Sequence, residues 1–89
     1  MIVRIDEAFE KDSDNITDKK ILLRLADCIE NVKRAKSLRE IAGIKKLQGV
    51  KNHYRIRIGD YRIGIIEEGG EVFFIRFLNR KDIYRYFPR

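Results

Sequence analysis

The sequence has no tryptophan and contains one cysteine, one histidine and one proline among its 89 residues. The single cysteine, Cys28, excludes an internal disulfide and a cysteine-based metal site, and this cysteine usage is typical of a reducing cytoplasm. The chain also shows no cluster of metal ligands, no glycine-rich phosphate loop that enters a helix, and no Ser/His/Asp set. We therefore expect neither a metal ion nor a cofactor.

Long apolar segments are absent as well. No run approaches the roughly 20 apolar residues of a membrane span, and the first residues do not form an apolar secretory segment. We expect a cytoplasmic protein without a membrane partner. Hydrophobic residues make up 44% and charged residues 38% of the chain, as in ordinary globular proteins. The length predicts a single domain over residues 1–89.

The net charge of +6 is unevenly distributed. Residues 1–44 contain nine basic and nine acidic residues, whereas residues 45–89 contain eleven basic and five acidic ones. The whole excess lies in the second half, as expected of a nucleic-acid-binding surface. An acidic protein or a membrane surface would also attract such a charge, so charge alone does not identify the partner.

The second half contains strict alternation of apolar and basic residues over the stretch 54–65. Successive side chains of a strand point to opposite faces, and Gly59 followed by Asp60 predicts a two-residue type II′ turn. This turn sets Arg57 opposite Arg62. The predicted apolar face comprises Tyr54, Ile56, Ile58, Tyr61, Ile63 and Ile65, and the opposite side, here named the cationic face, carries Arg55, Arg57 and Arg62.

Like charges that face each other across strands destabilise a sheet. The three guanidiniums of the cationic face have no acidic residue among them, so we interpret the face as a site for a polyanion. The alternative is that basic residues on edge strands keep a protein soluble and discourage aggregation. That alternative explains charge on an outer face but not the absence of acids within it.

The first part of the chain predicts one strand and two helices. The strand covers residues 1–6 and the first helix covers 7–16. Thr17 or Asp18 caps the second helix, which has one apolar stripe. The stripe comprises Ile21, Leu22, Leu25, Cys28, Ile29 and Val32.

A capping box and a following glycine predict a helical turn over 38–42, and residues 44–49 form a basic connection to the hairpin. A third strand covers 71–78, and Asn79 caps a final short turn. The fold class is therefore α+β: a strand, two helices and an antiparallel three-stranded meander. Both helices should pack on the apolar face and leave the cationic face open.

The second turn of the meander decides which residues join the cationic face, because a one-residue slip exchanges the two faces of a strand. We expect a three-residue turn, Glu68–Gly70, which places Arg76 and Arg80 on the cationic face. A turn of two or four residues would instead place there Phe73, Ile75 and Phe77.

The chemistry left to this chain is that of Arg, Lys and Tyr. Such side chains can bind a phosphodiester and stabilise the charge that develops on its oxygens. They need no metal ion when the substrate supplies its own nucleophile, as RNA does through its 2′-hydroxyl. Attack of that hydroxyl on the adjacent phosphate requires in-line positioning, neutralised oxygens and proton transfer.

Three segments of the chain carry a resemblance to a known family. They are Lys46-Leu47-Gln48-Gly49, the hairpin from Tyr54 to Arg62, and Asn79-Arg80-Lys81-Asp82-Ile83-Tyr84-Arg85. With the order of strand, two helices and sheet, they resemble the RelE/ParE superfamily of type II toxins over essentially the whole chain. The resemblance implies a RelE-like fold and a ribosome-dependent endonuclease that cuts mRNA. It also implies a cognate antitoxin, in a hetero-oligomer that binds operator DNA through the antitoxin.

The resemblance also implies roles for single residues. Arg62 and Arg80 would hold the phosphate and stabilise the transition state, and Tyr84 would act at the 2′-hydroxyl or stack on a base. The implied RNA-binding residues are Lys46, Arg55, Arg57 and Lys81. Two positions depart from the family pattern. Asn79 stands where many relatives have His, and Arg57 stands where Lys is the better proton-transfer group, since arginine stays protonated.

Two other functions stay open at this point. A ParE-like protein of the same fold would poison DNA gyrase and cut nothing, although the presence of Arg62 together with Arg80 and Tyr84 argues against it. A non-catalytic RNA- or antitoxin-binding module is favoured by the missing histidine at position 79. The alternation places His53 on the cationic face, and we interpret it as a surface histidine rather than a catalytic group.

Overall fold

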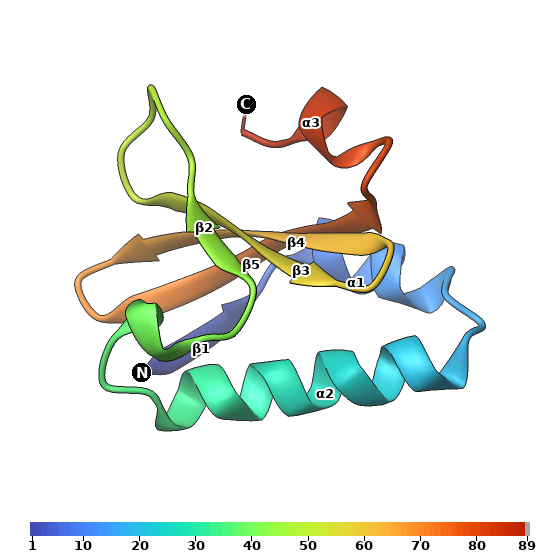
Figure 1. Ribbon diagram of the computed structural model, residues 1–89, viewed down its shortest axis with the longest axis horizontal. Coiled ribbons are helices and arrows are strands. Elements are labelled where there is room, and N and C mark those ends of the chain that lie inside the picture. The colour runs from blue at the N-terminus through green and yellow to red at the C-terminus, as the bar shows by residue number, and fades with distance from the viewer. Residues whose placement is uncertain (89) are drawn as a thin grey trace.

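The computed structural model describes residues 1–88. In chain order the elements are β1 (Ile2–Ile5), α1 (Glu7–Asp14), α2 (Lys19–Arg34), the 3-10 turn η1 (Leu38–Glu40), β2 (Ile44–Lys46), β3 (His53–Ile58), β4 (Tyr61–Glu68), β5 (Glu71–Asn79) and α3 (Ile83–Tyr86). They form a five-stranded sheet in the order β1-β5-β4-β3-β2. Helices α1 and α2 lie on one side of the sheet and α3 lies on the other (Figure 1). Among residues 1–88, no helix combines the length and apolar character needed to cross a bilayer.

The predicted meander is confirmed as β3, β4 and β5, and two further strands widen it. Strand β1 lies parallel to β5, so that the first strand of the chain pairs with the last. Residues 44–46, which we expected in a connection, form the edge strand β2 beside β3. This prediction was wrong because a three-residue strand is too short for alternation to show in a sequence.

Both main helices pack on the apolar face, as predicted. In α1 the ring of Phe9 contacts that of Phe74 at 5.5 Å between centroids. Helix α1 ends at Asp14, earlier than the predicted residue 16, because the segment after it is rich in weak helix formers. Asp18, and not Thr17, caps α2 by accepting from two backbone amides. The buried residues of α2 all belong to the predicted stripe and are Leu25, Cys28 and Val32.

Strand β5 meets β4 through the two-residue turn Gly69–Gly70, and not through the predicted three-residue turn. Near this turn the register places Phe73 on the cationic face, as a two-residue turn requires. A β-bulge then inserts one extra residue, Ile75, into β5. Beyond the bulge Arg76 pairs with Gly64, which returns Arg76 to the cationic face. The predicted turn length was wrong, whereas the predicted face of Arg76 is confirmed.

The C-terminal segment corrects a further expectation, that the cationic face is left open. Ile83 and Phe87 are buried although they follow the last strand. The ring of Phe87 lies so close to Gly64 that a Cβ at that position would meet it at 2.5 Å. Because Gly64 interrupts a row of longer side chains, the sheet has space there for an aromatic ring. Part of the cationic face is therefore covered.

Candidate nucleic-acid interface

The hairpin of β3 and β4 positions three arginines in the predicted register. Arg57 pairs with Arg62, and Arg55 pairs with Gly64. Gly59 adopts a positive φ of 56°, as the first residue of a type II′ turn requires. The cationic face therefore carries its guanidiniums on neighbouring strands, and their repulsion is not relieved by a carboxylate within the pairs.

Arg80 joins these arginines from the end of β5. Its amide donates to the carbonyl of Asp60 at 2.8 Å, which holds the start of the C-terminal segment against the hairpin turn. Arg57 and Arg80 are exposed, whereas Arg55 and Arg62 are half-buried. The arginine cluster, as named from here on, comprises Arg55, Arg57, Arg62 and Arg80.

The pKa of Arg62 responds to the other charges of the arginine cluster. Burial lowers the pKa of the Arg62 guanidinium, and the charges of Arg55 and Arg57 lower this pKa further. Tyr84 raises it, because an ionised phenol is negative, and Arg80 again lowers it. Each of these groups thus lies close enough to act on Arg62. The repulsion would be relieved by an anion, which is the role expected of a phosphate.

The half-buried arginines are held by backbone carbonyls. Arg62 donates from Nη1 to the carbonyls of Gly59 and Tyr61, at 2.9 and 3.0 Å. Arg55 donates from Nη1 to the carbonyl of Gly43 at 2.8 Å. A guanidinium has five N–H donors, so most donors of each side chain remain for a ligand. The hairpin thus fixes the charges before any ligand binds, which is the arrangement that favours electrostatic stabilisation.

Tyr84 lies on α3, beside this cluster. Tyr84 is 57% exposed, the highest value among the exposed aromatic residues. An exposed tyrosine next to cations can stack on a base or hydrogen-bond a ribose hydroxyl. The structure therefore brings together all three predicted catalytic residues, Arg62, Arg80 and Tyr84, with Arg55 and Arg57.

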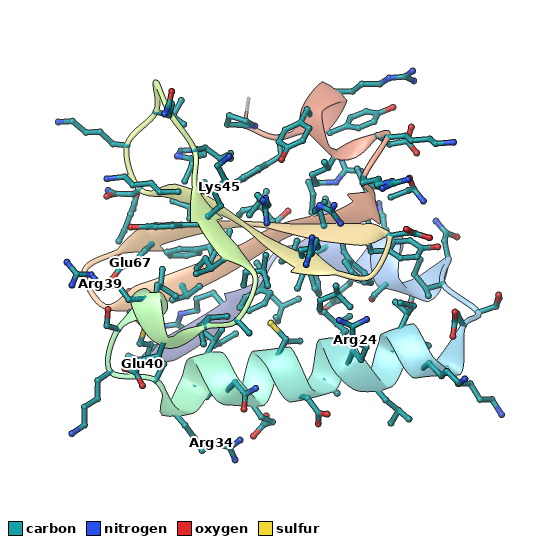
Figure 2. All side chains as sticks on the ribbon, in the orientation of Figure 1. Arg24, Arg34, Arg39, Glu40, Lys45 and Glu67 are labelled. Carbon is teal, nitrogen blue, oxygen red and sulfur yellow. The ribbon has the colours of Figure 1, made fainter. Side chains whose placement is uncertain are left out.

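One of the two predicted lysines lies away from the arginine cluster. Lys46 pairs with Tyr54 and lines a groove on the helix side of the sheet, so the structure does not bring it to the arginine cluster. Its neighbour Lys45 pairs with Arg55 and shares the cationic face; Figure 2 labels it on β2. Lys81 is exposed in the turn between β5 and α3. The family resemblance assigned Lys46 to RNA binding. Residues 44–46 were not recognised as a strand, and in a strand Lys45 and Lys46 point to opposite faces.

Asn79 and His53 also differ from simple expectation. Asn79 pairs with Tyr61 on the helix side, and its Oδ1 accepts the amide of Lys81 at 3.0 Å. It caps the final turn, as predicted, and does not face the cluster. His53 does share the cationic face, but its ring packs on Phe87 at 5.4 Å between centroids. It is half-buried rather than a free surface histidine.

One buried polar contact was not predicted from the sequence. Asp12 is 8% exposed and accepts from Nε and Nη2 of Arg76, at 2.8 and 3.0 Å. It also accepts the amide of Phe77 at 2.9 Å, on the part of β5 beyond the end of β1. The Arg76 guanidinium lies 4.8 Å from the ring centroid of Tyr86. Arg76 is thus engaged by the protein, and no local signal links residues 64 positions apart.

The fold and the arginine cluster define a small toxin of the type II class. Residues 3–84 match the family described as ParE toxin of type II toxin-antitoxin system, parDE, and the chain belongs to this family within the RelE/ParE superfamily. It is 42% identical to Toxin RelE3 from Methanocaldococcus jannaschii over 89 residues, which cover 99% of this chain and 100% of that relative.

Solved structures agree with this assignment. The RelB-RelE antitoxin-toxin complex from Methanococcus jannaschii matches with a TM-score of 0.82 and 40% identity, over 96% of this chain and 99% of that chain. The YoeB dimer from Staphylococcus aureus matches with a TM-score of 0.73 at 14% identity, over 90% and 97%. The second likeness concerns the fold alone. The predicted superfamily and fold class are both confirmed.

Proposed function

We propose that this toxin is an endoribonuclease that cuts mRNA on the ribosome and is neutralised by a cognate antitoxin. The observation that carries the proposal is the preorganised arginine cluster with Tyr84 beside it. Similarity to proteins named as RelE toxins supports it. A surface of this kind suits a polyanion whose charge increases during the reaction.

The reaction follows from the substrate's own chemistry. The RNA 2′-oxygen attacks the adjacent phosphorus as the bond from phosphorus to the 5′-oxygen breaks, which leaves a 2′,3′-cyclic phosphate and a 5′-hydroxyl. The 2′-hydroxyl loses its proton and the leaving oxygen gains one. Arg62 and Arg80 neutralise the non-bridging oxygens, while Arg55 and Arg57 bind the RNA backbone. Tyr84 hydrogen-bonds the 2′-hydroxyl or stacks on a base.

Proton transfer is the weak part of this site. Position 79 does not face the cluster, and the guanidiniums of the cluster stay protonated. Electrostatic stabilisation and in-line positioning must therefore supply most of the acceleration. We expect a toxin whose rate depends steeply on its arginines.

The antitoxin should be recognised by charge. Residues 45–89 carry eleven basic and five acidic residues, so we expect an acidic or amphipathic segment that folds on this toxin. The hetero-oligomer would bind operator DNA through the antitoxin. Co-expression with the neighbouring reading frame should suppress toxicity and yield a complex that co-purifies. Harmless expression of this chain alone, with no such partner, would contradict the proposal.

The test of catalysis is primer extension on mRNA after brief induction, followed by single-turnover cleavage on programmed ribosomes. Arg80→Ala should lower the rate constant roughly 10²–10³-fold, the scale of removing one preorganised charge stabiliser. Arg34→Ala is the matched control, because Arg34 lies on α2, on the far side from the cationic face (Figure 2). Its rate should equal that of the wild type.

The rival functions give different results in the same cells. A gyrase poison would leave mRNA intact and accumulate broken DNA. A non-catalytic module would bind ribosomes or antitoxin without producing new 5′ ends. Either pattern would refute the endoribonuclease proposal, as would an Arg80→Ala variant that cuts at the wild-type rate.

A further inference from the structure

The C-terminal segment forms a second, small apolar cluster on the cationic face. Ile83 is 0% and Phe87 is 2% exposed, yet neither belongs to the main core on the helix side of the sheet. The ring of Phe87 covers Gly64, where a Cβ would meet three ring carbons at 2.5, 2.6 and 2.9 Å. His53 flanks the same ring. We name the contact between Phe87 and Gly64 the Gly64 seat.

The glycine at this position provides space and not backbone freedom. Gly59 and the turn glycines have positive φ, whereas Gly64 lies within β4 without one. Glycine weakens a strand interior, and it marks sites where another group approaches the backbone closely. The absence of a side chain at 64 is therefore explained by the ring that lies there.

The Gly64 seat acts on α3 together with the buried Ile83 and the contact of Tyr86 with Arg76. The helix is a single turn of four residues, and its N-cap Asp82 makes no side-chain capping bond. An isolated turn of helix is unstable in water, because nucleation costs more than a few hydrogen bonds return. Phe87 closes the turn, since its amide donates to the carbonyl of Ile83 at 2.9 Å. Burial of Phe87 thus holds the turn closed.

Tyr84 lies in sequence between these two buried residues, is exposed, and lies close enough to Arg62 to act on it electrostatically. We propose that Phe87, through the Gly64 seat, is the positioning residue that holds the Tyr84 hydroxyl in the reaction geometry. The inference rests on the proposed endoribonuclease function. Phe87 packs on Gly64 and His53, and neither of these residues belongs to the arginine cluster. Its effect on the reaction would pass through Tyr84.

Two substitutions test the seat from opposite sides. Phe87→Ala removes the ring and leaves the sheet unchanged, and Gly64→Ala adds a methyl group that displaces the ring. Each should lower the single-turnover rate constant about 10²-fold, as a displacement of about 1 Å does. The toxin concentration that gives half-maximal rate should not move, because the arginines remain in place. Phe87→Leu, which keeps an apolar group in the seat, should recover most of the rate.

The decisive comparison adds Tyr84→Phe. This change should lower the rate strongly in the wild type and hardly at all in Gly64→Ala, because a displaced Tyr84 has no contribution left to lose. An equal loss in both backgrounds would overturn the inference. So would a Phe87→Ala variant with the wild-type rate constant.

A second readout does not depend on cleavage. 3-Fluorotyrosine incorporated at position 84 alone should show a ¹⁹F shift close to that of an unfolded peptide in Phe87→Ala, and the folded shift in the Arg34→Ala control. A folded shift in Phe87→Ala would overturn the inference even if the toxin cut no RNA. Absence of cleavage with a shift that responds to Phe87→Ala would instead refute the proposed function and leave the seat in place.

Discussion

Replacement of Asp12 by alanine should destabilise the toxin although Asp12 lies outside the apolar core. The carboxylate accepts three hydrogen bonds, two from Arg76 and one from the amide of Phe77. Removal of one partner from a fully buried ion pair costs about 3–5 kcal/mol. The Arg76 side chain keeps 23% exposure, so water solvates part of the stranded charge and about 1–2 kcal/mol is the better figure for the pair.

The amide of Phe77 adds to this loss. Phe77 is fully buried, and its N–H lies where β1 no longer covers the edge of β5. An unsatisfied buried donor costs about 1–3 kcal/mol. The free energy of unfolding should therefore fall by about 2–5 kcal/mol in Asp12→Ala. Urea denaturation followed by circular dichroism measures this directly, and the slope of the unfolding free energy against urea should stay constant.

Two companion variants separate the causes. Asp12→Asn keeps an acceptor for the Phe77 amide, so its loss should be about half that of Asp12→Ala. Lys11→Ala, on the same helix, removes an exposed pair with Glu7 and should change stability by at most about 0.5 kcal/mol. A loss below about 1 kcal/mol in Asp12→Ala would mean that water already solvates the pair. The ion pair would then not stabilise the edge of β5.

Three further outcomes are expected. Asn79→His should not accelerate cleavage or introduce a pH dependence near neutrality, because the side chain faces away from the arginine cluster; a faster enzyme in single-turnover assays would place position 79 at the scissile phosphate. Lys45→Ala should weaken ribosome binding in a salt-dependent manner, whereas Lys46→Ala should not. Equal effects would argue against the assignment of Lys45 and Lys46 to opposite faces of β2. Burial raises the pKa of the Cys28 thiol to about 11, so only about 0.1% is thiolate at pH 8. Labelling by a thiol reagent should therefore be slow in the native protein and should rise with pH, and rapid labelling at pH 7 would show that α2 opens.

The hairpin could be predicted in detail because its information is local. Alternation over residues 54–65 and a Gly-Asp turn fix the faces, and the observed pairs of Arg57 with Arg62 and Arg55 with Gly64 follow from them. The stripe of α2 was local in the same way, and its buried residues were predicted. Arg80 and Tyr84 were assigned through resemblance to a family. The structure places both residues beside Arg62.

Contacts between distant segments could not be predicted. Residues Ile44–Lys46 form strand β2 because they pair with β3, and nothing in these three residues alone indicates a strand. The pair of Asp12 and Arg76 spans 64 positions and depends on where β1 ends. The covering of Gly64 by Phe87 likewise depends on the path of the chain after β5. These are also the contacts that decide which charges remain available to a ligand.

The bulge at Ile75 decides which face of the sheet each residue at the end of β5 occupies. The two-residue turn alone would direct Phe77 to the cationic face and Arg76 to the core, and the extra residue in β5 cancels this inversion. Deletion of Ile75 would make the ladder regular and keep the pairs of Phe74 with Ile65 and of Arg76 with Gly64, so the same side chains would stay on the same faces. Pairing of Ile75 itself with Gly64 would instead turn the end of β5 over, with its buried phenylalanine and its arginines. A relative with one residue fewer at position 75 should therefore keep the cationic face, and an alignment that places this gap beyond α3 would misplace Arg80 and Tyr84.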